Sequence, residues 1–146
     1  MEVITSSGCT AFCTFCTVHR AYREKGRSLR LRSAENVLEE IEAYKLKHDI
    51  RHVQFLDDSF TIDKIRIRKI IKGLKGMGLS WNCDTRVNLL DRELVREMVE
   101  SGCKKVSLGV ESGSEKILKL INKNITLEQV RDAFKWCYEA KLETIE

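Results

Sequence analysis

Residues 9–16 of the chain read CTAFCTFC, so three of its six cysteines fall within eight residues. The spacing is Cys9-x3-Cys13-x2-Cys16, and Gly8 in front of it allows a tight backbone path into the loop. A 4Fe–4S cluster is normally held by four thiolates. Three closely spaced thiolates can hold three of its irons and leave the fourth open, as a catalytic metal centre requires. We therefore interpret Cys9, Cys13 and Cys16 as ligands of a 4Fe–4S cluster with one open coordination site.

Two alternatives for these cysteines stay open, namely a structural zinc site and reactive thiols without a metal. Zinc needs a fourth ligand, and His19 is close enough in sequence to supply it. Against this, Cys3His zinc sites usually divide their ligands between two separate knuckles. We interpret the remaining three cysteines, Cys83, Cys103 and Cys137, as small core residues.

Outside the cysteine segment, short apolar strands alternate with amphipathic helices. We predict strands at residues 2–5, 52–56, 79–83, 104–110 and 142–145. We predict N-caps at Ser33 and Asp91, and capping boxes at Ser112-x-x-Glu115 and Thr126-x-x-Gln129. Such alternation indicates right-handed βαβ units and a parallel sheet.

The predicted fold class is α/β, as part of a parallel (β/α) barrel with outer helices. The fifth predicted strand only begins at the end of the chain, so we expect one incomplete domain over residues 1–146, truncated at that strand. The cysteine loop directly follows the first strand, which places it at the carboxyl rim of the barrel, where active sites gather. The unpaired barrel edge predicts self-association of the chain.

Composition favours an ordinary globular domain, with 42% hydrophobic and 33% charged residues. No apolar run approaches the roughly 20 residues that cross a membrane, and the N-terminus lacks a signal-peptide core. We therefore expect a cytoplasmic protein. The net charge is only +4 and aromatic residues make up 7%, so no nucleic-acid partner is expected.

At the cysteine motif the sequence resembles the radical S-adenosylmethionine (SAM) superfamily, whose motif is CxxxCxΦC with an aromatic residue, here Phe15, at Φ. Further segments follow in the order that is typical of the cobalamin-binding-domain branch: TSSGC at 5–9, LRS at 31–33, FLDDSF at 55–60, TR at 85–86 and LGVESG at 108–113. That branch includes anaerobic oxidative cyclases and many methyltransferases. The family usually has arginine and proline where this chain has Ser7 and Thr10.

The resemblance implies a partial (β/α)6 barrel that holds the cluster at its open face. It implies that the open iron chelates SAM and that one electron cleaves SAM to a 5′-deoxyadenosyl radical, which abstracts hydrogen from a small-molecule substrate that the sequence does not identify. It also implies reduced flavodoxin or ferredoxin as electron donor. Cobalamin would bind through a domain absent from this chain, and the chain alone is expected to be inactive.

The resemblance further implies SAM contacts near the cluster. Phe15 would lie beside the adenine. Asp57 and Asp58 end the second predicted strand, where other members carry a Gly-Gly-Glu that meets the SAM amino group. Adjacent side chains on a strand face opposite ways, so one of these carboxylates would contact SAM and the other would cap the next turn.

Three residues at the ends of later strands complete the predicted contacts. Arg86 would pair with a carboxylate of SAM or of the substrate. Glu111 and Ser112 resemble the segment that contacts the ribose and methionine parts. The alternative for each predicted contact residue is a hydrogen-bonded or packed residue of the barrel rim. For the whole chain, the alternatives are a methylthiotransferase-type radical SAM enzyme and a non-catalytic iron–sulfur or zinc module.

Overall fold

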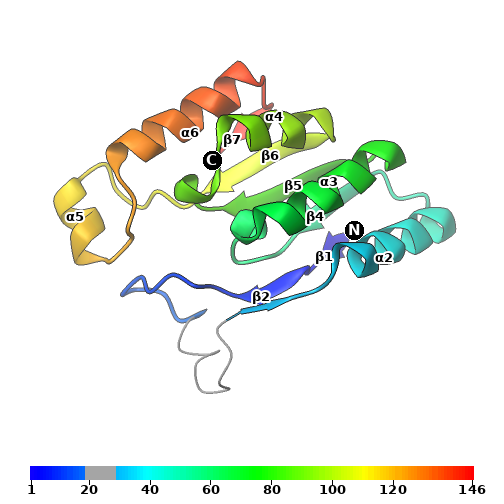
Figure 1. Ribbon diagram of the computed structural model, residues 1–146, viewed down its shortest axis with the longest axis horizontal. Coiled ribbons are helices and arrows are strands. Elements are labelled where there is room, and N and C mark those ends of the chain that lie inside the picture. Colours follow the sequence, from blue (N-terminus) through cyan, green and yellow to red (C-terminus); the bar gives the residue numbers. More distant parts are fainter. Residues whose placement is uncertain (19–28) are drawn as a thin grey trace.

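A five-stranded parallel sheet forms the centre of the computed structural model, which describes residues 1–18 and 29–146 (Figure 1). The strand order is β1-β4-β5-β6-β7, with every neighbouring pair parallel. The strands are β1 (Glu2–Val3), β4 (His52–Phe55), β5 (Ser80–Thr85), β6 (Cys103–Leu108) and β7 (Thr144–Ile145). The five predicted strands and the α/β class are therefore confirmed.

Helices connect these strands and pack against one face of the sheet (Figure 1). They are α2 (Ala34–His48), α3 (Lys64–Met77), α4 (Arg92–Glu100), α5 (Glu115–Leu120) and α6 (Leu127–Glu139). Helix α3 contacts α2 and α4, and α4 contacts α6. The short helix α5 lies beyond the carboxyl ends of the strands, near the cysteine loop. Among the described residues, no helix is long and apolar enough to cross a membrane.

Three of the four predicted caps are present. The side chains of Ser33 and Asp91 accept bonds from backbone N–H groups at the starts of α2 and α4, and Thr126 and Gln129 form a reciprocal box. The box at Ser112 is wrong, because α5 begins only at Glu115, after Ser114. Ser112 Oγ instead accepts a bond from the N–H of Ser114 at 3.1 Å and shapes the turn before the helix.

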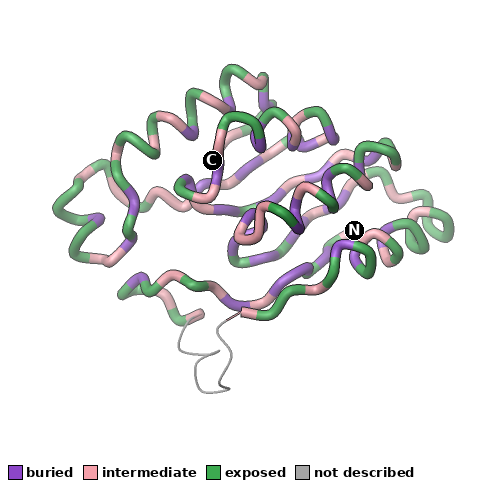
Figure 2. Tube along the Cα trace, viewed as in Figure 1, coloured by how far each residue is buried: buried purple, intermediate pink, exposed green. Residues whose placement is uncertain are grey.

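The core lies between the sheet and the helices. Alternate strand residues point into it, and Val53, Phe55 and Trp81 are fully buried. Phe55 stacks on Phe60 with ring centroids 4.3 Å apart, and Trp81 Nε1 donates to the backbone oxygen of Ser101 at 3.1 Å. Figure 2 shows this burial as buried segments along the strands and the sheet-facing sides of the helices. Cys83, Cys103 and Cys137 are buried here, as predicted.

The opposite face of the sheet carries polar side chains. Strand register places one row of five across it: Glu2, Gln54, Asn82, Lys105 and Thr144. A parallel barrel usually fills this interior with branched apolar residues. The Oδ1 atom of Asn82 is buried and has no hydrogen-bond partner in the part of the chain that the structure describes. This face therefore differs from an ordinary apolar barrel core.

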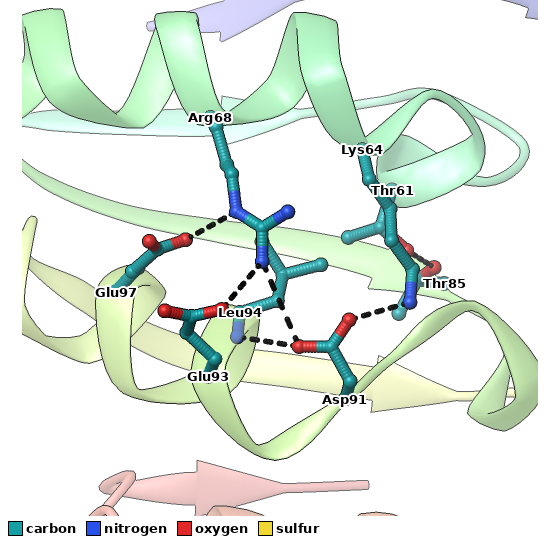
Figure 3. A network of polar contacts seen from close by, with 8 residues as sticks. All are labelled: Thr61, Lys64, Arg68, Thr85, Asp91, Glu93, Leu94 and Glu97. Atoms are coloured by element: carbon teal, nitrogen blue, oxygen red, sulfur yellow. Dashed lines mark hydrogen bonds and ion pairs between the residues drawn. The ribbon is translucent and has the colours of Figure 1, made fainter.

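Ion pairs join α3 to the start of α4 (Figure 3). Arg68 Nε lies 2.9 Å from Glu97 Oε2, its Nη2 lies 3.3 Å from Glu93 Oε2, and Lys64 Nζ lies 2.6 Å from Asp91 Oδ2. These side chains are partly exposed, so each pair contributes about 0.5 kcal/mol. The network fixes how the two helices are aligned.

A second, two-stranded sheet was not predicted. Strand β2 (Ser6–Gly8) pairs antiparallel with β3 (Leu29–Leu31), in the part of the chain between the predicted strands at 2–5 and 52–56. Strands of three residues are too short to show an alternating pattern. The pairing holds the two ends of the cysteine segment together. His19, the alternative zinc ligand, lies outside the described residues.

Candidate functional site

A cavity of about 390 Å³ opens at the carboxyl edge of the sheet. Its wall combines residues of the cysteine loop with residues that follow β4, β5 and β6. The chemically relevant members are Cys9, Cys13, Phe15, Cys16, Asp58, Arg86, Glu111 and Lys123. The three predicted cluster ligands therefore share one cavity with most of the predicted SAM contacts.

The three cysteines of the loop line this cavity, and Cys13 and Cys16 flank one turn. Cys13 is 4% exposed, whereas Cys9 and Cys16 are half-buried. The N–H of Cys16 donates to the backbone oxygen of Cys13 at 3.1 Å, and Gly8 enters the loop at a φ of 93°. Among residues 1–18 and 29–146, no three Cys, His, Asp or Glu side chains are close enough to enclose a metal ion. Three sulfur donors on one wall nonetheless form a donor set that suits an iron–sulfur cluster.

The turn between α5 and α6 supports the cysteine loop. The N–H of Thr14 donates to the backbone oxygen of Ile121 at 2.9 Å, and Asn122 Nδ2 donates to the backbone oxygen of Phe12 at 2.8 Å. Asn122 and Asn124 have φ values of 52° and 53°, a left-handed conformation that asparagine tolerates better than most residues. The loop is thus held at two backbone positions next to Cys13.

Arg86 follows β5 and reaches the same loop. Its Nη1 donates to Cys13 Sγ at 3.3 Å, and its Nη2 donates to the backbone oxygen of Lys123. A guanidinium is always protonated and presents its donors in a rigid fork. Arg86 therefore brings a fixed positive charge to the most buried of the three loop thiols.

Lys123 is a second cation at the cavity, and it is not among the predicted contacts. It is 4% exposed, its Nζ lies 2.7 Å from Glu111 Oε1, and the same Nζ lies 5.9 Å from the centroid of the Phe15 ring. Gly109 leaves room for it, because a Cβ there would lie 2.9 Å from Nζ. The flanking asparagines favour a left-handed turn, but no local feature of the sequence indicates that this lysine reaches the cavity.

Asp57 and Asp58 point to different places. Asp57 is 2% exposed and lies next to the start of β2. Its Oδ1 accepts a hydrogen bond from Thr5 Oγ1 at 2.9 Å and another from Ser6 Oγ. Arg66 donates to Thr5 in the same cluster, and burial lowers the pKa of its guanidinium against the opposing effect of Asp57.

Asp58 instead lies at the cavity, where its Oδ2 accepts a bond from the N–H of Gly8 at 3.1 Å. The structure therefore brings Phe15, Asp58, Arg86 and Glu111 to the cysteines. Asp57 and Ser112 lie outside the cavity lining.

The radical SAM superfamily profile matches residues 3–146. The chain belongs to the radical SAM superfamily. That match covers nearly the whole chain and includes every described element that contributes to the cavity. The family match and the methyltransferase relatives support the prediction of a radical SAM enzyme.

The relatives of this chain are longer proteins. An uncharacterized methyltransferase of Pyrococcus horikoshii is 38% identical over 135 residues, which are 91% of this chain and 29% of that protein. Cytidylyl-2-hydroxyethylphosphonate methyltransferase of Streptomyces wedmorensis is 35% identical over 138 residues, which are 92% of this chain and 25% of that protein. The chain thus spans between a quarter and a third of their length. Relatives of lower identity include an anaerobic magnesium-protoporphyrin IX monomethyl ester cyclase and a putative methylthiotransferase.

A solved structure with the same fold is that of OxsB, a cobalamin-dependent SAM radical enzyme with aqua-cobalamin and SAM bound. It matches with a TM-score of 0.81 and 25% identity, over 99% of this chain and 23% of that one. The likeness confirms the radical SAM type of barrel for the sheet and helices described above.

Proposed function

We propose that this chain is the part of a radical SAM enzyme that binds the 4Fe–4S cluster and SAM, with Cys9, Cys13 and Cys16 as the iron ligands. The observation that carries the proposal is the shared cavity at the carboxyl edge of the sheet, which three thiols and two cations line together. When bound, the cluster supplies the electron that cleaves SAM to a 5′-deoxyadenosyl radical.

The chain's own residues would then bind and orient SAM. An amino acid moiety carries an ammonium group and a carboxylate, and the cavity offers a partner for each. Asp58 supplies an exposed carboxylate beside the loop, and Lys123 supplies a buried ammonium. Glu111 balances the charge of that ammonium in the free protein, at 2.7 Å. Phe15 presents an aromatic ring at the cavity against which an adenine can stack.

The reaction that follows radical formation is proposed from the relatives. Methyl transfer is favoured, because the two relatives of highest identity described above are methyltransferases. Oxidative cyclisation is the alternative, and methylthio transfer is a third. Cobalamin would bind through another part of the parent protein, and reduced flavodoxin or ferredoxin would supply the electron. A non-catalytic iron–sulfur module would bind the cluster without responding to SAM.

Cluster reconstitution in cysteine variants tests the ligand assignment. The chain is incubated anaerobically with iron and sulfide, as wild type and as Cys9→Ala, Cys13→Ala and Cys16→Ala, with Cys83→Ala as a matched control from the core. We expect about four irons per chain in the wild type and in the control, and a large loss in each loop variant. The assignment would be overturned if the loop variants held as much iron as the wild type, or if only Cys83→Ala lost its iron. Zinc uptake in place of iron would support the zinc module.

A further inference from the structure

We propose that Arg86 sets the reduction potential of the cluster through its hydrogen bond to Cys13. The proposal rests on the proposed function, in which Cys13 is an iron ligand. It adds a role in electron transfer to a residue that the sequence predicts as a carboxylate partner or a residue of the barrel rim. In this role Arg86 is a positioning residue: its charge, held beside the sulfur of Cys13, acts on the cluster through that sulfur.

The contact has the geometry that such a role needs. Nη1 of Arg86 lies 3.3 Å from Cys13 Sγ, while Nη2 is held by the backbone oxygen of Lys123. Two bonds from one rigid fork fix the guanidinium, so its charge stays beside the sulfur. Cys13 is also the buried thiol of the loop, at 4% exposed, and a charge interaction is stronger where water is excluded.

The other groups near the thiols do not supply this charge. Cys9 Sγ accepts a neutral backbone N–H, that of Ala11, at 3.4 Å. Lys123 is paired with Glu111 at 2.7 Å, so its charge is largely balanced. Among the ion pairs within 4.0 Å in the described parts of the chain, none includes Arg86. Of the two cations that line the cavity, Arg86 is therefore the one that forms no ion pair within 4.0 Å with a carboxylate of residues 1–18 and 29–146.

A fixed cation at a ligand sulfur favours the reduced cluster. Reduction adds one negative charge to the iron–sulfur unit and its thiolates. Hydrogen bonds to the sulfurs and nearby charge are among the factors that set such potentials. A positive charge and an N–H···S bond both stabilise the added electron, so Arg86 raises the potential and makes reduction by a biological donor easier.

Redox titration of the reconstituted chain without SAM tests this role. Wild type, Arg86→Gln, Arg86→Lys and Arg96→Gln are poised over a range of potentials, and the reduced cluster is quantified by EPR. Arg96 lies on α4 with its side chain 64% exposed, and it controls for the loss of one positive charge. We expect Arg86→Gln to lower the equilibrium constant for cluster reduction tenfold, which lowers the reduction potential by about 59 mV for one electron. Arg86→Lys keeps the charge but not the fork, so its reduction potential should fall less than that of Arg86→Gln. The reduction potential of Arg96→Gln should match that of the wild type.

The outcomes separate this proposal from the proposed function. A wild-type chain that binds no cluster contradicts the function. A wild-type potential in Arg86→Gln with a full cluster overturns the role of Arg86 and leaves the function standing. If Arg86→Gln loses its cluster, the test rests on Arg86→Lys. A reduction potential of Arg86→Lys below that of the wild type supports the role of Arg86, and a wild-type potential overturns it. A residue that only anchors SAM would leave all potentials unchanged in the absence of SAM.

Discussion

Asn122 Nδ2 donates a hydrogen bond to the backbone oxygen of Phe12 at 2.8 Å, across 110 residues of chain. Beside this contact, the N–H of Thr14 donates to the backbone oxygen of Ile121 at 2.9 Å. The turn after α5 thus positions the loop that carries the three thiols. A cluster site on a long loop needs this support, because an irregular loop has no sheet or helix partners of its own.

Replacement of Asn122 by glycine should loosen the cysteine loop while leaving the turn intact. Glycine accepts the φ of 52° but cannot supply the amide bond, which contributes about 1 kcal/mol. Hydrogen exchange at the amide of Thr14 should accelerate by about fivefold. Asn122→Ala should accelerate it further, because a left-handed alanine costs about another 1 kcal/mol. Unchanged exchange at Thr14 in the glycine variant, with the amide of Ile71 in α3 as reference, would show that the contact does not hold the loop.

Asp57 and Asp58 should differ in their effects on stability. Asp57→Ala removes the shared acceptor of Thr5 and Ser6 in a buried cluster, so we expect a loss of about 3 kcal/mol in the free energy of unfolding. Asp58→Ala removes one bond from an exposed residue and should cost about 1 kcal/mol or less. Urea unfolding of the two variants measures both values. Equal losses would refute the division between a structural and a cavity carboxylate.

Stability should fall at alkaline pH through Cys137. Burial, with a smaller effect of Cys103, raises the pKa of its thiol to about 11. An unfolded thiol ionises near pH 8.5, so above that pH the unfolded chain releases a proton that the folded chain keeps. The stabilising effect is complete below about pH 8.5 and is lost towards pH 11, by about 1.4 kcal/mol per pH unit. Urea unfolding between these pH values should show that the free energy of unfolding declines less steeply with pH in Cys137→Ala than in the wild type. Parallel declines in the two proteins would contradict the role of Cys137.

Lys123→Met should weaken SAM binding without unfolding the chain. Its partner Glu111 has a side chain 36% exposed, so water can solvate the carboxylate that the substitution leaves unpaired. We expect the SAM concentration that half-saturates the spectral change of the reconstituted cluster to rise by about tenfold, since a charge-assisted hydrogen bond contributes about 1.5–3 kcal/mol. Lys135→Met, which replaces an exposed lysine of α6, is the control. Equal SAM dependence in wild type and Lys123→Met would exclude a role for this ammonium.

Local sequence signals predicted most of the fold. The parallel sheet followed from the alternation of apolar patterns, and Ser33, Asp91 and Thr126 marked helix starts through chemistry that acts within three residues. The pairing of Ser6–Gly8 with Leu29–Leu31 depends instead on segments far apart in the chain that are too short to show a pattern. Ser112 resembled a cap, yet Glu111 before it has a φ of 71°, and the helix begins later.

The site was less predictable than the fold. The cysteine spacing was visible because its residues lie close in sequence. Strand alternation predicted that Asp57 and Asp58 diverge, but which of them faces the cavity depends on the hydroxyls of Thr5 and Ser6. Lys123 reaches the cavity only because the chain turns back after α5, and the bond from Arg86 to Cys13 joins residues 73 apart. Contacts of that range leave no local signal in one sequence.

The EPR spectrum of the reconstituted, reduced chain, recorded with and without SAM, tests the central claim most directly. The claim is that three loop cysteines hold a 4Fe–4S cluster whose fourth iron is open to SAM. It predicts a reduced-cluster signal that changes in shape when SAM is added, because SAM then binds at that iron. A reduced-cluster signal that stays the same at saturating SAM would contradict it.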